Sequence, residues 1–221
     1  FGIQVLSTTL NIRSLTPTAP DGLDDVYDGE TYRTSQEYTQ AHARFGLIVD
    51  VFKMMLLVAF WVAGGFNYID LAVRAMGWNE ISSGMAFIGI FVLVSMLFSV
   101  PLSFYRTFGI EAKFGFNKTT YLTFAVDTLK GICVSAVIGA PVLAGILYLF
   151  ENMGSLSWLY AWTFVTFLSF IISFIAPVWI MPIFNKFTPL EPGELRDAII
   201  EYARTVDFKY GNIYVVDGSK R

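Results

Sequence analysis

The chain has 221 residues, of which 55% are hydrophobic and only 15% charged, against about 25% charged residues in an average soluble domain. This balance indicates an integral membrane protein. The net charge of -3 argues against a nucleic-acid partner, because such a binder needs a basic face to neutralise phosphates. The single cysteine, Cys133, excludes an intrachain disulfide and a cysteine-based metal site. Its place in an apolar run predicts a small buried side chain.

The first 44 residues precede the first long apolar run. Residues 1–12 resemble the tail of an apolar segment, and the sequence begins with Phe rather than Met, so we expect the chain to be part of a longer protein. Residues 16–30 carry two prolines, two glycines and five acidic residues, which predicts a loop. Residues 34–44 then show the pattern of a polar helix that leads into the membrane.

Four windows are long and apolar enough to cross the bilayer, which takes about 20 helical residues. They are continuously apolar rather than alternating, so helices are predicted and not barrel strands. The expected fold class is therefore an all-α polytopic membrane protein whose membrane domain covers 45–183. Its four complete transmembrane helices are predicted at 45–66, 84–104, 124–150 and 157–183.

Lysine and arginine are distributed unevenly between the two sides of these spans. Residues 1–44, 105–123 and 184–221 together carry twelve of them, whereas residues 67–83 and 151–156 carry one, Arg74. Because cytoplasmic loops are enriched in Lys and Arg, residues 105–123 and 184–221 are predicted to be cytoplasmic.

Two Asp-x-x-Lys pairs lie inside predicted spans, Asp50 with Lys53 and Asp127 with Lys130. Residues three apart share one helical face, and both pairs fall in the first two turns from the cytoplasmic side. Local pairing with the lysine reaching to the interface would account for them. Alternatively, these four residues line a water-filled cavity or the seat of a cytoplasmic domain. Further along, prolines predict kinks in the third and fourth spans.

The composition after residue 183 is that of a soluble segment. Apolar residues recur at helical spacing from 195 to 206, with residues 188–192 as start signals, and residues 212–216 read as a strand followed by a turn at Asp217-Gly218. One helix and one strand cannot bury a core alone. Residues 184–221 are therefore predicted to begin a soluble α/β domain.

Charged side chains alternate with aromatic rings in residues 105–120, which is too patterned for a plain connector. The chain has one histidine, His42, so it cannot build a His-Glu-x-x-His zinc motif. His42 itself is expected at the surface.

Three stretches resemble the CAAX prenyl protease type I family: residues 32–39, 108–120 and 176–195, together with the closing 216–221. Members of this family are integral-membrane zinc metalloproteases of the gluzincin type. The resemblance implies a seven-span membrane chamber and a zinc protease domain that faces it. It implies removal of the last three residues from proteins with a prenylated C-terminal cysteine, or degradation of membrane-associated polypeptides.

On that template, residues 1–44 are the end of a preceding span and a cytoplasmic loop and helix, and residues 184–221 begin the metalloprotease domain. The zinc ligands and catalytic residues are expected downstream of Arg221, so none is expected in this chain. Expected partners are a prenylated or membrane-bound polypeptide, the bilayer and the C-terminal protease half. The expected location is the bacterial inner membrane or the endoplasmic reticulum.

We expect one group of polar residues to dock the protease half or to line the substrate's route: Arg106, Glu111, Lys113, Asn117, Lys118, Asn185 and Lys186. Aromatic belts and contacts to anionic lipid would also explain part of the 105–120 pattern. A small transporter or channel subunit, or a non-catalytic scaffold, remain alternative functions.

Overall fold

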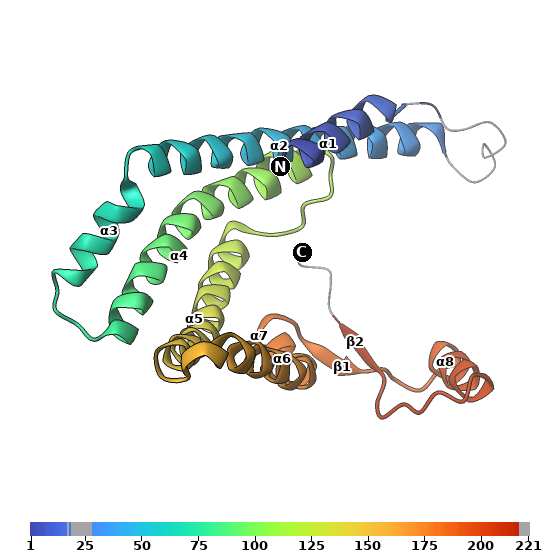
Figure 1. Cartoon of the computed structure of the whole chain (residues 1–221). Helices are drawn as coiled ribbons and strands as arrows, with labels where there is room; N and C mark the ends of the chain where they lie inside the picture. Colours follow the sequence, from blue (N-terminus) through green and yellow to red (C-terminus); the bar gives the residue numbers. More distant parts are fainter. Residues whose placement is uncertain (17, 19–27, 217–221) are drawn as a thin grey trace. The chain divides into compact units, whose positions relative to one another are not determined.

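The computed structural model describes residues 1–16, 18 and 28–216. Most of the predicted loop at 16–30 and the predicted turn at Asp217-Gly218 lie outside the described residues. The chain divides into two compact units, Phe1–Lys118 and Thr119–Arg221, which are described separately (Figure 1).

The first unit consists of helices. α1 packs along α2, and α2 and α4 both contact the short α3 between them. The elements are α1 (Gly2–Ser14), α2 (Gly29–Val62), α3 (Gly65–Arg74), α4 (Glu80–Tyr105) and a π-helical segment η1 (Arg106–Glu111) that continues α4.

α2 joins two predicted elements, the polar helix at 34–44 and the first span, in one continuous helix. Its N-terminus is capped by Asp28, whose carboxylate accepts hydrogen bonds from the Thr31 backbone N–H at 3.0 Å and hydroxyl at 2.8 Å. These bonds lower the pKa of Asp28. The helix ends at Val62 rather than at the predicted 66, because Gly64 adopts a left-handed conformation with φ 72°.

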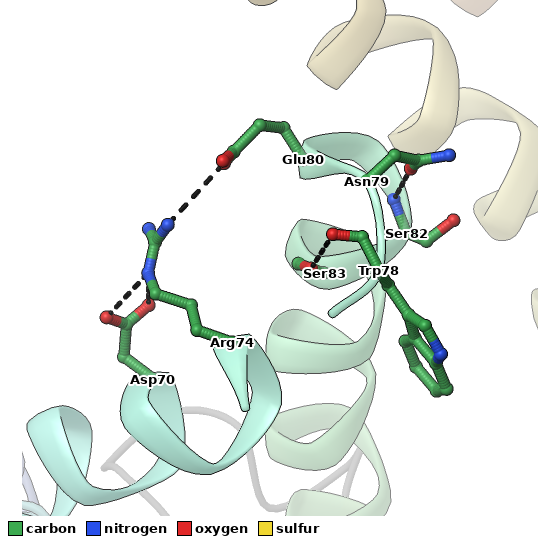
Figure 2. Close-up of polar contacts among 7 residues, drawn as sticks. All are labelled: Asp70, Arg74, Trp78, Asn79, Glu80, Ser82 and Ser83. Atoms are coloured by element: carbon green, nitrogen blue, oxygen red, sulfur yellow. Dashed lines mark hydrogen bonds and ion pairs between the residues drawn. The ribbon is translucent and has the colours of Figure 1, made fainter. Parts of the chain in front are cut away.

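The turn between α3 and α4 carries Arg74, the cation that the sequence places on this side of the membrane. Figure 2 shows its guanidinium between Asp70, at 2.9 Å, and Glu80, at 3.6 Å. The hydrogen bond to Asp70 raises the pKa of Arg74. Asn79 caps α4 by accepting from the Ser82 N–H at 2.8 Å. The positive charge of Arg74 is therefore locally balanced, which reinforces the charge asymmetry between the two sides.

The second unit begins with two helices packed on each other, α5 and α6, and ends in a small sheet. β1 and β2 pair antiparallel, with Thr188 opposite Val215. The elements are α5 (Tyr121–Asn152), the 3₁₀ turn η2 (Gly154–Leu156), α6 (Ser157–Ile175), the π-helical segment η3 (Ala176–Ile180), α7 (Met181–Phe184), β1 (Phe187–Pro189), α8 (Glu194–Thr205) and β2 (Tyr214–Val216).

The four predicted spans are confirmed. Among the described residues, four helical segments are long and apolar enough to cross a membrane: Gly29–Val62, Glu80–Glu111, Tyr121–Asn152 and Gly154–Phe184. Their side chains are mostly exposed within the chain, as expected for helices whose surroundings are lipid or other helices. α5 remains helical through Pro141, whereas the fourth span changes to π-helical geometry at Ala176, where Pro177 follows.

Two predicted segments differ from the structure. The segment predicted at 105–123 between two spans is helical in its first part, because helical geometry continues through η1 and on to Lys113, with Ile110 buried. Residues 187–189 form strand β1, which was not predicted, and Thr188 and Pro189 lie opposite β2. The helix and strand predicted after residue 194 are confirmed as α8 and β2.

Gly65→Ala should destabilise the first unit. A Cβ at residue 65 would overlap the Phe60 ring, which cannot move freely because Phe66 and Phe91 pack against it at 5.0 and 5.8 Å. We expect a loss of about 1–3 kcal/mol, measured as a lower Tm in detergent. Gly46→Ala is the control, since its Cβ would meet no atom within 4 Å and the substitution should be neutral or stabilising. Equal Tm changes for both variants would contradict this packing.

Candidate functional site

The segment after α4 is held against α2 by aromatic rings. Tyr38 lies at the centre, with its ring 5.6 Å from Phe114 and 4.8 Å from Phe116, both edge-on. Phe45 also contacts Tyr105, at 5.1 Å. The rings that alternate with charges in 105–120 therefore have partners within the chain and fix the segment on the polar half of α2.

His42 belongs to the same aromatic group. Its ring lies 5.7 Å from Tyr38 and the side chain is half-buried, so it is less exposed than expected. A lone histidine in an aromatic stack can pack against its neighbours without any catalytic partner.

The polar candidates of this segment do not converge on one point. Lys113 and Lys118 are exposed, and the Lys113 ammonium lies 5.4 Å from the Phe114 ring centroid. Glu111 contributes its backbone carbonyl, which accepts from the N–H groups of Phe116 at 2.9 Å and Asn117 at 3.3 Å. These two bonds close the turn that follows η1.

Arg106 begins η1 and is half-buried. Its Nε is fully buried and has no hydrogen-bond partner among the residues that the structure describes. A buried guanidinium nitrogen without an acceptor costs free energy, and π-helical segments frequently occur at functional sites. Among these polar candidates, Arg106 is thus the residue with a buried donor that has no acceptor in the described part of the chain.

In the second unit, two pairs of candidate residues that were predicted for different roles lie together. Asp127 and Lys130 from α5 and Asn185 and Lys186, which follow α7, line one polar pocket of about 500 Å³. All but Lys186 are half-buried. The two pairs could not be joined from the sequence, because 54 residues of chain lie between Lys130 and Asn185.

Lys130 connects the two sides of this pocket. Its ammonium Nζ donates to the backbone carbonyl of Ile183 at 2.9 Å, one residue before the fourth span ends at Phe184. The last carbonyls of a helix have no partner within the helix, and a cation there also complements the helix dipole. Lys130 therefore caps the helix end from a neighbouring helix. Residue types alone do not indicate this role, because the partner is a backbone group.

An apolar groove of about 610 Å³ adjoins the polar pocket, and Ile183 lines both. Cys133 and Val137 of α5 and Leu168 and Ile172 of α6 are among its lining residues. Cys133 is exposed, so the prediction of a buried side chain is wrong. The reason is that the α5–α6 contact leaves this face of α5 open.

The groove residues were missed in the sequence because every face of these spans is apolar. The spacing of Val134, Val137, Ile138 and Pro141 is helical, but it does not stand out in a run where nearly all residues are hydrophobic.

Asp50 and Lys53 are exposed residues of the first unit, and no ion pair joins them among residues 1–16, 18 and 28–216. Lys53 borders a largely apolar groove of about 310 Å³ formed with Phe60, Phe91 and Phe98. A common cavity for both Asp-x-x-Lys pairs stays a prediction.

These features define a polytopic helical membrane domain with a polar pocket where its last span ends. A family model described as "CAAX prenyl protease N-terminal, five membrane helices" matches residues 9–186. The match begins inside α1, and the described residues contain four candidate spans. Because the match covers well over half of the chain, the chain belongs to the CAAX prenyl protease family.

Individual relatives agree with this membership. The CAAX prenyl protease 1 of Saccharomyces cerevisiae is 35% identical over 100% of this chain and 51% of its own length. The human CAAX prenyl protease 1 homolog is 33% identical over 95% of this chain and 46% of its own. The crystal structure of Saccharomyces mikatae Ste24p superposes with a TM-score of 0.90 at 32% identity, over 100% of this chain and 52% of that one. The chain spans about half the length of the curated relatives it matches.

Lys130→Met should loosen the end of the fourth span. The methionine keeps the apolar stem but removes the donor to Ile183, and a hydrogen bond from a charged group contributes about 1.5–3 kcal/mol. The Asn185 N–H, bonded to Met181 O at 2.9 Å, should exchange with deuterium about tenfold faster or more. Lys53→Met, in the other unit, should leave that exchange unchanged. Unchanged exchange in Lys130→Met would contradict the capping role.

Tyr38→Ala should release the segment after η1 from α2. The variant loses two edge-on ring contacts of about 0.5–1.5 kcal/mol each. In permeabilised membranes, trypsin should therefore cut after Lys113 and Lys118 several-fold faster than in the wild type. Tyr68→Ala, at an exposed tyrosine of α3, serves as the control. If both variants were cut at the wild-type rate, the rings would not be what fixes this segment.

Proposed function

We propose that this chain is the membrane-chamber part of an integral-membrane zinc metalloendopeptidase that removes the C-terminal tripeptide from prenylated CAAX proteins. The single observation that carries this is the match to the family over residues 9–186, together with the TM-score of 0.90 to a solved relative over the whole chain. Degradation of membrane-associated polypeptides is a further activity that the same chamber would support.

Zinc and the catalytic residues belong, in this proposal, to the protease half of the complete protein. The chain has one histidine, and the described residues contain no group of three His, Cys, Asp or Glu that could hold a metal ion. We therefore place the metal ligands in the protease half rather than in the part of the chain that the structure describes. Bound zinc in the whole protein would activate water for attack on the peptide carbonyl.

We further propose that residues 184–221 begin that protease half on the cytoplasmic side. Its support is the change from apolar spans to a small sheet with α8 beyond Phe184 and the excess of Lys and Arg on this side. The relatives compared come from yeast and human, which favours the endoplasmic reticulum as the membrane.

Arg106 is our first candidate for docking, because its half-buried guanidinium begins the π-helical segment η1, a geometry frequent at functional sites. Lys113 and Lys118 are exposed further along the same segment, while Glu111 and Asn117 help to close the turn there. A carboxylate on the protease half would satisfy Arg106. In the second unit, Asn185 and Lys186 stand where the substrate would pass from the membrane spans to that half.

The proposal is tested with the full-length protein reconstituted in lipid vesicles and a farnesylated CAAX peptide. We expect release of the intact C-terminal tripeptide, loss of activity with a zinc chelator and recovery when zinc is returned. The same peptide without the farnesyl group is the control and should be cut poorly. The 221-residue chain alone should cut neither. Chelator-resistant cleavage, or equal cleavage of both peptides, would refute the proposal.

A further inference from the structure

The apolar groove of the second unit has the size and lining of a ligand site. Its volume of about 610 Å³ falls in the range of about 300–1,000 Å³ that is usual for small-molecule pockets. Val137 and Ile138 of α5, Leu168 and Ile172 of α6, and Trp179 of η3 contribute apolar side chains to it. Because both helices are membrane spans, the groove suits a hydrocarbon chain.

One end of the groove is positively charged. At Ile183 it meets the polar pocket, which holds two ammonium groups, Lys130 and Lys186, and one carboxylate, Asp127. Asn185 adds an amide. Lys130 uses one donor on the Ile183 carbonyl, and an ammonium has three. The balance of charge favours an anionic group beside the hydrocarbon chain.

The distance between the two parts restricts the ligand. Lys130 and Cys133 are three residues apart on α5, which is about 4.5 Å along the helix axis. This short spacing suits an anionic group that is attached within a few bonds of the hydrocarbon chain. In an uncleaved CAAX protein, the C-terminal carboxylate lies three residues beyond the prenylated cysteine, about 10 Å away in an extended chain.

Cleavage changes this spacing. Hydrolysis of the peptide bond after the prenylated cysteine consumes one water, leaves a carboxylate on that cysteine and frees the amino group of the tripeptide. The new carboxylate and the isoprenoid then belong to the same residue, as the groove and the pocket require.

We propose that the groove and the polar pocket together bind the prenylated C-terminal cysteine of the cleaved product. The isoprenoid lies between α5 and α6, and the new carboxylate contacts Lys130 and Lys186. This site rests on the proposed function, because it takes its ligand from that reaction. It would retain the prenylated product in the membrane domain while the tripeptide leaves.

The test is photoaffinity labelling of the full-length protein in phosphatidylcholine vesicles. The probe is S-farnesylcysteine, N-acetylated, with a diazirine in the isoprenoid and a free carboxylate. Labels should map to residues 133–142 of α5 and 168–175 of α6. Unlabelled N-acetyl-farnesylcysteine should compete, while its methyl ester should compete about tenfold less, as expected for loss of a charge-assisted contact.

Stearic acid distinguishes a prenyl site from a general lipid groove. Its carboxylate meets the charge requirement, but its linear saturated chain lacks the methyl branches of a farnesyl group, so we expect weak competition because the shape of the groove selects the isoprenoid. Labels elsewhere in the protein, or equal competition by the acid, the ester and stearic acid, would overturn the proposal.

Two variants test the two halves of the site. Val137→Trp places a large ring in the groove and should reduce labelling at least about fivefold, whereas Ala136→Trp, at an exposed neighbour outside the lining, should not. Lys186→Gln removes an exposed charge and should weaken competition by the acid about tenfold while leaving the ester unchanged. Lys209→Gln, an exposed lysine outside the pocket, is its control. Wild-type labelling and competition in both Val137→Trp and Lys186→Gln would overturn the proposal.

The labelling does not depend on proteolysis, so the two proposals can fail independently. Groove labelling that the acid displaces, in a protein that cuts no CAAX peptide, would support the site and refute the proposed function. Proteolysis with labels outside the groove would refute the site alone.

Discussion

Two groups are costly in the hydrocarbon of a membrane: a cation within a span, and the unbonded carbonyls at the end of a helix. In the second unit, one hydrogen bond gives a partner to each. The Lys130 ammonium donates to the Ile183 carbonyl at 2.9 Å. This contact ties α5 to the end of the fourth span, just before the chain passes into β1. The polar pocket and the groove meet at the same residue, so their geometry depends on it.

The first unit ends its second span in a different way. α4 passes into η1 at Arg106, and aromatic contacts to Tyr38 and Phe45, rather than a charge on a carbonyl, hold the following segment against α2. Aromatic side chains suit this depth because their apolar bodies and polar edges both find partners at the interface. Both units thus leave regular α-helical geometry through a π-helical segment, η1 or η3, where a span meets the predicted cytoplasmic side.

The number and kind of spans could be predicted because hydropathy over 20 residues is a property of the local sequence. The end of α2 could not be predicted, because the sequence does not distinguish a glycine with a left-handed backbone, such as Gly64, from a glycine inside a helix. β1 was missed because its partner, Val215, lies 27 residues beyond Thr188. The role of Lys130 was missed for a related reason: a backbone acceptor 53 residues away leaves no mark on residue type. The pairing of the two candidate groups in one pocket follows from those same long-range contacts.

Burial of a hydrocarbon chain cannot by itself select a ligand inside a membrane. Each buried methylene contributes about 0.8 kcal/mol relative to water, but it gains nearly as much in the surrounding lipid, so the groove offers little net affinity for the chain alone. Selectivity must come from the shape of the groove and from the charged end. The Lys130 side chain is already ordered by its hydrogen bond to Ile183. Binding a carboxylate would therefore cost less side-chain entropy at Lys130 than at a lysine without such a bond. The residue that completes the helix end is for this reason also the one best prepared to receive an anion.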